Sequence, residues 1–342
     1  MKNFLFQLLV SISAILVSWN CTAQETSKNQ TYIRHDTLNV VSYNIENFFY
    51  FEDDSTKNDD DFTPEGGYVW TEYKMKQKAI KIGRVIASLN GWSPPEIVGI
   101  CEIEGPAALD ALLKASGLSK CSYSGICYPT QDRRGVSVAL IYNNIAVKIL
   151  ESHPINTSLP EQEFFTRDIL YAKFTFRRDT FHIMVNHWPS KYGGESETVW
   201  KRNHVALRAK ASCDSILNIS PDAKIILLGD FNDTADAPAI FEVLGATKNG
   251  PTLINLSGDT KKNSYKYRGV WSTIDHIIVS SAMCEKSRPS FTVCDLDFLL
   301  ENDETNSGSK PYRTFIGMKY NGGYSDHLPV LMKYPMEIIY HK

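Results

Sequence analysis

Residues 229–233 (GDFND) combine side chains that can hold and polarise a water molecule. They directly follow an apolar run at residues 224–228, which predicts a buried strand. Asp230 and Asn232 are two positions apart, and in an extended chain such side chains project to the same side. A carboxylate and an amide placed together can orient water and also donate to a phosphate oxygen. Because Gly, Asp and Asn are also the commonest turn residues, an ordinary turn is the structural alternative for this segment alone.

A second segment of this kind is residues 324–329 (YSDHLP), where Asp326 and His327 precede an apolar strand. Carboxylate oxygen suits a hard cation such as Mg²⁺, and imidazole can act as acid, base or phosphate ligand near neutral pH. Asp275 lies in an otherwise apolar strand, so its carboxylate needs a partner. Pairing with His327 would fix the imidazole and stabilise its charged form. His276 alternates to the opposite face and is interpreted as structural.

Polar side chains also follow three other predicted strands. Asn44 ends the first strand and Glu102 the second, and an amide with a carboxylate at adjacent strand ends makes an oxygen-ligand metal site. Glu46 and Glu104 compete with them for this role. His187 ends a later strand, where its imidazole can contact a phosphate oxygen. Since function in layered folds gathers at strand ends and the loops that follow, we expect these side chains to lie together.

The elements that must position these residues are buried strands interspersed with amphipathic helices. Apolar and β-branched runs predict the strands, and apolar residues at helical spacing predict the helices. Without strict strand–helix alternation, the pattern favours mixed sheets in a single α/β domain at residues 37–342. The expected strands are 38–45, 97–101, 136–142, 174–176, 181–186, 224–228, 273–279 and 328–332; the expected helices are 74–89, 107–115, 199–217 and 237–244; and the main expected loops are 52–67 and 301–312.

The order of these segments resembles the endonuclease/exonuclease/phosphatase superfamily, which includes DNase I-like nucleases, abasic-site endonucleases, sphingomyelinases and inositol-polyphosphate phosphatases. An Asn after the first strand is followed by a Glu after the second, then a His, GDFND, an Asp in an apolar strand and a terminal SDH. The resemblance covers residues 38–334. The finer motifs NIENFF, DFTPEGG, RGVSVALIY, NHWPSKYGG and GDFND resemble a secreted bacterial branch labelled as extracellular nucleases. Cys101 stands where the superfamily commonly has Gln.

The resemblance implies a fold and a metal site. The fold would be a four-layered α/β sandwich, in which two packed mixed β-sheets are flanked by helices, as in DNase I-like proteins. Glu102 and Asn44 would bind Mg²⁺ or Mn²⁺, and Asp326 would be a further metal-site carboxylate.

The resemblance also implies catalytic roles. Asp230, with Asn232, would orient and deprotonate the attacking water. His187 and His327 would stabilise the charged transition state, and Asp275 would hold His327. The reaction would be metal-assisted hydrolysis, with water attacking phosphorus in line and no covalent intermediate.

Composition limits the substrate without fixing it. With a formal net charge of −3, the chain lacks the strongly basic balance of a dedicated nucleic-acid clamp, although an enzyme needs only a local positive groove. We expect a secreted nuclease; its oligomeric state does not follow from the sequence, and a monomer is assumed. A phosphodiesterase or phosphatase acting on a lipid head group or inositol phosphate, and a catalytically silent secreted binding protein on the same fold, stay open as alternatives. Five basic residues are either a nucleic-acid rim or an ordinary solvated surface: Arg133, Arg134, Lys191, Lys201 and Arg202.

The N-terminus predicts export to the periplasm or beyond. Lys2 followed by the apolar run at residues 4–17 is typical of a signal peptide and too short for a comfortable membrane span, and no other stretch is long enough to span one. Small residues place the cleavage after Ala23. A lipoprotein anchored through Cys21 and a retained anchor are the alternatives. Residues 24–36 are polar and are expected to form a flexible leader.

Six cysteines remain in the expected mature chain. An oxidising compartment permits disulfides, and closeness in sequence makes Cys121 with Cys127, and Cys284 with Cys294, the candidate pairs. Buried free thiols are the alternative. The spacings do not suggest a zinc site.

Overall fold

The computed structural model describes residues 31–341 with the exception of Trp92. The chain forms two units, of which one is His35–Ile338 and the other consists of Met1–Arg34 with Ile339–Lys342. The described residues of the second unit are extended strand residues. The helices, strands and site residues treated below belong to the unit His35–Ile338, except for residues 31–34 and 339–341 at the outer ends of two strands.

Strand β1 (Thr31–Phe48) begins earlier than the sequence predicts. Residues 31–36, which were expected in a flexible leader, are part of this strand, because a strand is held by backbone hydrogen bonds that polar side chains do not prevent. The rest of that leader and the predicted signal peptide, with its cleavage after Ala23 and the alternative anchor at Cys21, lie outside the described residues.

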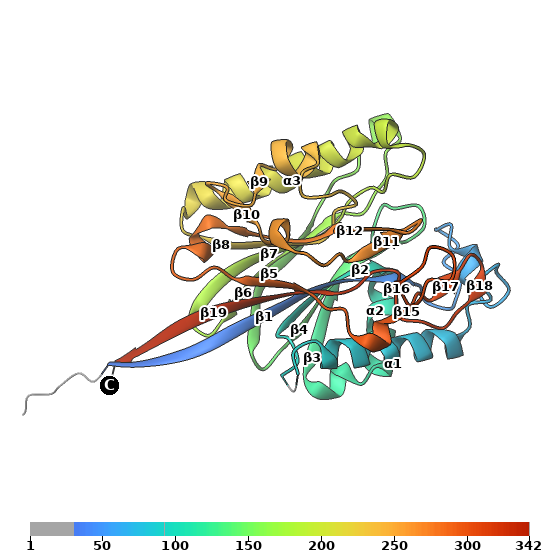
Figure 1. Ribbon diagram of the computed structural model, residues 1–342, viewed down its shortest axis with the longest axis horizontal. Helices are drawn as coiled ribbons and strands as arrows, with labels where there is room; N and C mark the ends of the chain where they lie inside the picture. Colours follow the sequence, from blue (N-terminus) through green and yellow to red (C-terminus); the bar gives the residue numbers. More distant parts are fainter. Residues whose placement is uncertain (1–30, 92, 342) are drawn as a thin grey trace, which may run out of the picture. The chain divides into compact units, whose positions relative to one another are not determined.

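Two large mixed sheets are the centre of the unit His35–Ile338 (Figure 1). Each combines parallel and antiparallel neighbours: β1 with β2 and β7 with β8 are parallel, whereas β2 with β4 and β8 with β13 are antiparallel. In spatial order the first sheet consists of β14 (Ser290–Val293), β19 (Val330–His341), β1, β2 (Ile97–Ile103), β4 (Ser137–Asn143) and β3 (Tyr123–Cys127), and the second of β5 (Val147–Ile155), β6 (Ile169–Phe176), β7 (Asp179–His187), β8 (Lys224–Asp230), β13 (Asp275–Ser280), β10 (Leu253–Asn255) and β9 (Ala246–Thr247).

Helices cover the outer face of each sheet (Figure 1). α1 (Glu72–Ser88) and α2 (Gly105–Ala115) lie on the first sheet, and α3 (Glu195–Ile219) lies on the second. The resulting order of helices, sheet, sheet and helices is the four-layered α/β sandwich implied by the resemblance, so that prediction is confirmed.

Strand β8 shows why continuous apolar runs form the inner strands. Ile226 and Leu228 pack in the hydrophobic core that includes the facing sheet, whereas Ile225 and Leu227 pack in the core beneath α3. Because β8 is buried on both faces, every position of the run must be apolar rather than every second one. The same core beneath α3 contains Val205, Ala206, Ala209 and Cys213 of that helix.

The helix and strand predictions are confirmed for the long, strongly patterned segments, with ends shifted by a few residues. Residues 237–244, expected as a short helix, form a π-helical turn, η4 (Ala239–Val243). Three small hairpins were not predicted, and one of them overlaps the expected loop at residues 301–312, beginning one residue before it. They are β11 (Tyr265–Tyr267) with β12 (Val270–Ser272), β15 (Leu300–Asn302) with β16 (Ser309–Pro311), and β17 (Phe315–Ile316) with β18 (Lys319–Tyr320).

The structure also bears on the expected disulfides and on membrane-spanning helices. The six cysteines at positions 101, 121, 127, 213, 284 and 294 are all free, so neither candidate disulfide forms in this structure. No helix within the described ranges has the length and apolar character needed to cross a membrane.

Gly229 brings the backbone of β8 close to that of β7 beside the polar strand ends. Its φ is 142°, and a Cβ atom there would lie 1.8 Å from the Asn186 carbonyl oxygen of the neighbouring strand. Since a backbone oxygen cannot swing aside like a side-chain tip, Gly229→Ala should lower the free energy of unfolding by about 2 kcal/mol or more.

Urea unfolding of the purified protein measures this loss. Gly258→Ala is the matched control, because its Cβ would meet nothing closer than Lys248 Cβ at 3.8 Å, and it should change stability by about 0.5 kcal/mol at most. Equal stability of the two variants would contradict the close approach at Gly229.

Candidate active site

Strand register in the second sheet places three predicted site residues side by side. His187 pairs with Asp230 across the parallel β7–β8 ladder, and Asp230 pairs with Asp275 across the antiparallel β8–β13 ladder. All three side chains are buried, with 5%, 2% and 1% exposure respectively. Two carboxylates directly opposite each other repel unless other groups compensate their charges, so this row requires cationic or hydrogen-bonding neighbours.

The first sheet supplies Asn44 and Glu102. Asn44 pairs with Cys101 in the β1–β2 ladder, and the register then shifts, so that Glu102 is the extra residue of a bulge and adopts a φ of 65°. A bulge re-aims a side chain, and a positive φ on a residue other than Gly costs energy that is commonly found at functional sites. Cys101 itself is buried, and its thiol donates to the carbonyl of Asn186.

The side-chain amide of Asn44 connects the two sheets. Its Nδ2 donates to Glu102 Oε1 at 3.0 Å and to Asp230 Oδ2 at 3.1 Å, and lies 3.4 Å from His327 Nε2. Its Oδ1 accepts from the backbone N–H of Glu46 at 3.0 Å, which fixes the orientation of the amide. In this arrangement Asn44 presents its NH₂ group, rather than its oxygen, to the carboxylates.

His327 forms the acid–imidazole pair expected from the sequence. Its Nδ1 lies 2.8 Å from Asp275 Oδ2, and its Nε2 lies 3.8 Å from Asp230 Oδ2. Burial opposes a charge on the ring, but the Asp275 and Asp230 carboxylates outweigh burial and raise the pKa of His327 well above its ordinary value. The imidazole is therefore positively charged at neutral pH.

Two residues that were not predicted as site residues support this pair. Ser264 is fully buried, and its hydroxyl donates to Asp275 Oδ2 at 2.6 Å. The Tyr265 ring packs on the His327 ring with centroids 4.6 Å apart, and the two residues form an isolated β-bridge. They lie in a polar stretch with no hydrophobic periodicity, so the sequence carries no signal for their position.

Asp326 lies at the edge of the cluster. Its Oδ1 is 4.0 Å from His327 Nε2, and its Oδ2 accepts from the Arg313 guanidinium at 3.2 Å. Arg313 also donates to Glu46, a buried carboxylate that accepts the backbone N–H of Thr314. Glu46 is thus occupied by these donors rather than facing Glu102.

Asn232 holds Asp230 rather than facing open space. Its backbone N–H donates to Asp230 Oδ1 at 2.9 Å, and its amide donates to the Trp188 carbonyl at 2.9 Å. Its φ of 51° is one that Asn tolerates better than most residues. All eight predicted site residues are therefore linked into one cluster, whereas His276 lies on the opposite face against Phe231 and the Asp233 carbonyl, as expected for a structural residue.

Burial sets the protonation of the other two groups in the row. It raises the pKa of Asp230 to about 7, with a further contribution from the Asp275 carboxylate and an opposing one from His327. It lowers the pKa of His187 well below the ordinary value, reinforced by Arg167 and Arg134, so this imidazole is neutral. Its Nδ1 is buried and has no hydrogen-bond partner.

The donor atoms of Glu102, His187 and Asp230 fit a divalent cation. One donor atom from each lies within 4.8 Å of the others. Two carboxylate oxygens and a neutral imidazole suit Mg²⁺ or Mn²⁺, and a cation would also relieve the cost of burying two acids together. The predicted metal set shares Glu102 with this group, while Asn44 and Asp326 lie beside it.

The charge of Asp275 generates a prediction for His327. In the metal-free protein, Asp275→Asn removes the carboxylate that most strongly favours the charged imidazole, so burial should dominate and the pKa of His327 should fall. Proton NMR of the His327 ring over a pH series measures this change. Ser264→Ala is the control, because it removes a hydrogen bond but keeps the charge and should leave the His327 pKa above its ordinary value. An unchanged pKa in Asp275→Asn would refute the pairing.

Comparison with known proteins places this cluster in a family. No curated protein matches the sequence. Three solved structures share the fold: an endonuclease/exonuclease/phosphatase family protein from Bacteroides thetaiotaomicron (15% identity, TM-score 0.56, covering 89% of this chain and 100% of that one), D. rerio TDP2 complexed with single-strand DNA product (16%, 0.54, 87% and 98%), and the mannosyl-6-phosphatase of Bacteroides thetaiotaomicron (16%, 0.56, 88% and 99%). At these identities the likeness establishes the fold alone.

A family model covers most of the chain. The model described as Endonuclease/Exonuclease/phosphatase family matches residues 39–335, a range that contains both sheets' site residues. The chain therefore belongs to the Endonuclease/Exonuclease/phosphatase family.

Proposed function

We propose that this protein is an exported, divalent-metal-dependent phosphoesterase that hydrolyses phosphodiester bonds by direct attack of water. Members of its family are metal-dependent phosphoesterases. The observation that carries the proposal is the convergence of Glu102, His187 and Asp230, drawn from both sheets, within 4.8 Å. Export rests on the predicted signal peptide at residues 1–23 and on the motifs that resemble a secreted bacterial branch.

Asp230 is the proposed proton acceptor. Its carboxylate lies between Glu102, His187 and His327, where it can take a proton from the attacking water. Asn232 donates to its Oδ1, which leaves Oδ2 turned toward the centre of the site. Glu102, His187 and Asp230 would hold the cation, which when bound acts as a Lewis acid on a phosphoryl oxygen and favours the charged form of Asp230.

His327 is the proposed donor to the phosphate. Asp275 accepts from its Nδ1, so Nε2–H faces the site and can donate to a phosphate oxygen as negative charge develops there. The family resemblance implies the same role for His187. The neutral state of His187 suits it better to metal binding, because the neutral imidazole is the form that binds cations.

Nucleic acid is the substrate we propose. A groove of about 550 Å³ beside the segment after His187 is lined by the basic side chains of Arg133, Arg134 and Lys201 and by Tyr192, which is 93% exposed. Basic groups bind a phosphate backbone, and an exposed aromatic ring stacks on bases. D. rerio TDP2, which shares this fold, has been solved with a single-strand DNA product, and this supports a nucleic-acid substrate.

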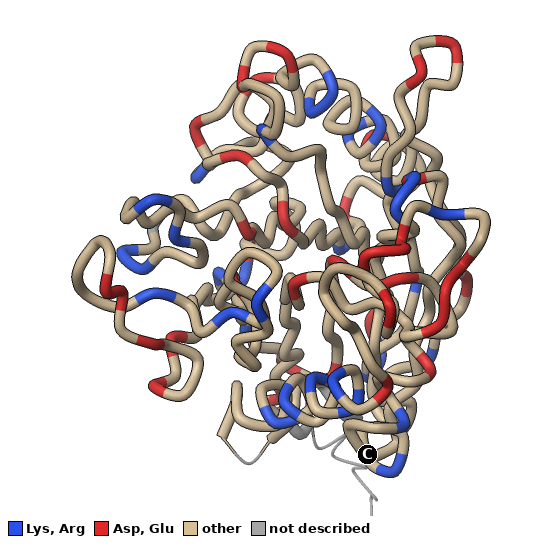
Figure 2. Tube along the Cα trace, turned by 90° about the vertical axis from the view of Figure 1, so that its right-hand side faces the viewer, with Lys and Arg blue, Asp and Glu red and all other residues tan. Residues whose placement is uncertain are grey.

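The expected basic rim is smaller than five residues. Lys191 pairs with Asp233 at 2.9 Å, and Arg202 is fully buried against the same carboxylate at 2.7 Å. Figure 2 draws Lys and Arg interspersed with Asp and Glu rather than gathered into one positive face. A phosphatase or phosphodiesterase acting on a smaller phosphate is therefore the second candidate, supported by the fold shared with a mannosyl-6-phosphatase.

The site predicts loss of hydrolysis when Asp230 or His327 is changed. Asp230→Asn and His327→Ala should each lower kcat by about 10²–10⁴-fold, because proton transfer or charge stabilisation is lost, and EDTA should abolish turnover until Mg²⁺ or Mn²⁺ is restored. Rates on plasmid DNA, RNA, sphingomyelin, an inositol polyphosphate and bis-p-nitrophenyl phosphate measure this. The control is Asp236→Asn, an exposed acid in the following loop, which should keep full activity.

The same panel separates the candidate functions. EDTA-sensitive cleavage of DNA or RNA supports the nuclease, whereas release of a head group or of phosphate with nucleic acid untouched favours the second candidate. Normal turnover in both site variants would refute the assigned site. A folded, metal-loaded protein that is silent on all five substrates would favour a binding protein.

The exposed ring of Tyr192 allows a test of whether the groove binds nucleic acid. If it stacks on a base, Tyr192→Ala should raise KM for an oligonucleotide by about 5–150-fold, equivalent to roughly 1–3 kcal/mol, and leave turnover of bis-p-nitrophenyl phosphate unchanged. Tyr73→Ala is the control, because Tyr73 is 70% exposed on α1 outside this groove. Equal kinetic effects of the two variants would exclude the groove as a nucleic-acid site.

A further inference from the structure

The end of β1 contains a bulge, residues 45–47, whose backbone aims two site residues. The β1–β2 register shifts in this segment, and Glu46 and Asn47 both have a φ of 51°. The Glu46 N–H donates to Asn44 Oδ1 at 3.0 Å, and the Asn47 N–H donates to Glu102 Oε2 at 2.8 Å. Because a positive φ costs energy for residues other than Gly, surrounding contacts must hold this bulge in its conformation.

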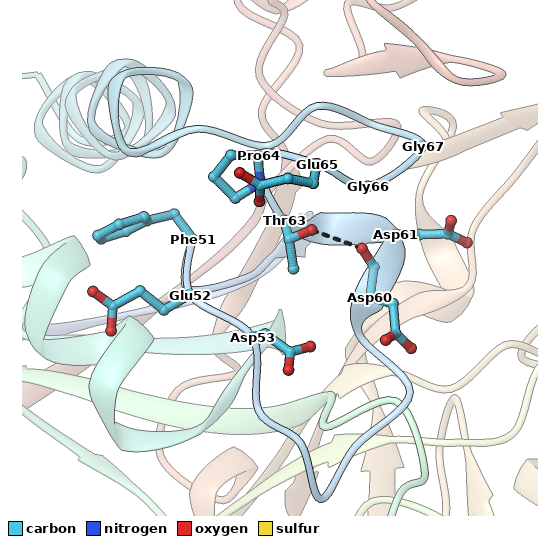
Figure 3. Close-up of a pocket in the computed structure, with 10 residues that line it drawn as sticks. All are labelled: Phe51, Glu52, Asp53, Asp60, Asp61, Thr63, Pro64, Glu65, Gly66 and Gly67. Carbon is cyan, nitrogen blue, oxygen red and sulfur yellow. Dashed lines mark hydrogen bonds between the residues drawn. The ribbon is translucent and has the colours of Figure 1, made fainter.

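The bulge leads into an acidic loop that offers it little rigidity. Figure 3 shows residues 51–67 of this loop folded around a pocket, with the carboxylates of Glu52 and Asp53 projecting from the chain. Both residues are exposed, as are Asp60 and Asp61. Exposed loops are among the more mobile parts of a fold, so a rigid support for the bulge must come from the helix that follows, α1.

Lys78 of α1 contacts the bulge directly. Its side chain is buried, with 1% exposure, and its ammonium donates to the backbone carbonyl of Glu46 rather than to a carboxylate. The ammonium also lies over the ring of Trp70, 6.0 Å from the centroid. Trp70 in turn donates its Nε1–H to the Phe49 carbonyl at 2.9 Å. Two buried side chains therefore hold the β1 backbone from the side of α1, one within the bulge and one just after it.

Core packing does not explain a lysine at position 78. The other buried residues of α1 are apolar or glycine: Met75, Ala79, Ile82, Gly83, Val85 and Ile86. A Met side chain of similar length would fill the same space without the cost of burying an ammonium group. The charge of Lys78 interacts favourably with the carboxylates of Glu46, Glu102 and Asp326. The ammonium group therefore serves the polar end of the first sheet rather than the core beneath α1.

We propose that Lys78 is a positioning residue for the proposed hydrolysis. By holding the Glu46 carbonyl, its ammonium keeps the two N–H groups of the bulge directed at Asn44 and Glu102. Lys78 touches neither the substrate nor the reacting atoms, so it acts through these two side chains. The inference rests on the proposed function, because it gives Lys78 a part in that reaction. Its structural half, the hold of Lys78 on the bulge, can be measured without substrate or metal.

Amide hydrogen exchange in the metal-free protein tests the hold on the bulge. In Lys78→Met, the N–H groups of Glu46 and Asn47 should exchange about 5–30-fold faster than in the parent, because the bulge loses its buried donor. The N–H groups of Ile226 and Leu228 in the central strand β8 are the internal reference. A general loss of stability would speed exchange in β8 as well, whereas loss of the positioning contact should speed exchange in the bulge alone.

Hydrolysis kinetics measure the consequence for the reaction. With saturating Mg²⁺ or Mn²⁺, Lys78→Met should lower kcat for bis-p-nitrophenyl phosphate by about 10–100-fold and leave KM close to that of the parent, because misplaced site residues slow the chemical step. Lys76→Met is the matched control. It makes the same change on the same helix, but Lys76 is exposed and pairs with Glu72 at 2.6 Å. This control should leave both amide exchange and kcat unchanged.

Two results with Lys78→Met would overturn the proposal. One is exchange in the bulge that is no faster than in the parent relative to β8, and the other is an unchanged kcat despite faster exchange. A parent that hydrolyses no substrate would refute the proposed function and with it a part for Lys78 in the reaction, while the exchange result would still show whether Lys78 holds the bulge. If Lys78→Met does not fold, Lys78→Gln replaces it with the same expectations, because its polar side chain is too short to reach the Glu46 carbonyl.

Discussion

At one end of the two sheets, the carboxylate of Glu102 from one sheet faces the carboxylate of Asp230 from the other. The rest of the site depends on how the repulsion between these two carboxylates is offset. The amide of Asn44 stands between them and donates to both. Its orientation is set in turn by the backbone N–H of Glu46. A hydrogen bond from one sheet to the other therefore fixes the spacing of the donor atoms that the proposed cation needs, and the hydrophobic core holds the sheets in the register that makes this bond.

The fold supplies side-chain directions that regular strands would not. Glu102 and Asn232 both have positive φ, and Gly229 permits an approach to β7 that no side chain would allow. Each departure follows directly on a buried apolar run, so the strain is held by a core that cannot easily yield. A rigid sandwich with strained ends keeps the donor atoms in place before a ligand arrives, which is what electrostatic stabilisation of a developing charge requires.

A residue's position could be predicted from the sequence where a local burial pattern determines it, and not where contacts with distant segments do. The run at β8 was predictable because burial on both faces demands apolar residues at every position, and the polar residues after it were predictable as strand ends. Strand β5 was not predicted, since its largely exposed face carries polar side chains without a core pattern. Ser264 lies beside Asp275 because the intervening β11–β12 hairpin folds back on itself, and this hairpin has no hydrophobic pattern. The direction of the Asn44 amide depends on a single backbone N–H. Long-range packing and backbone donors leave no local signature.

Most buried acids in the described part of the chain have a cationic side chain of their own close by. Asp275 has His327 at 2.8 Å, and similar partners serve two others: Arg202 for Asp233, and Arg313 for Glu46. Asp230 is compensated less closely, because the His187 and His327 rings lie 3.8 Å from its Oδ2 and His187 is neutral. A cation held by Glu102, His187 and Asp230 would lower the remaining cost of burying the Asp230 carboxylate. The charges of this cluster are therefore of the kind that a divalent cation, which enzymes of this family use, would stabilise.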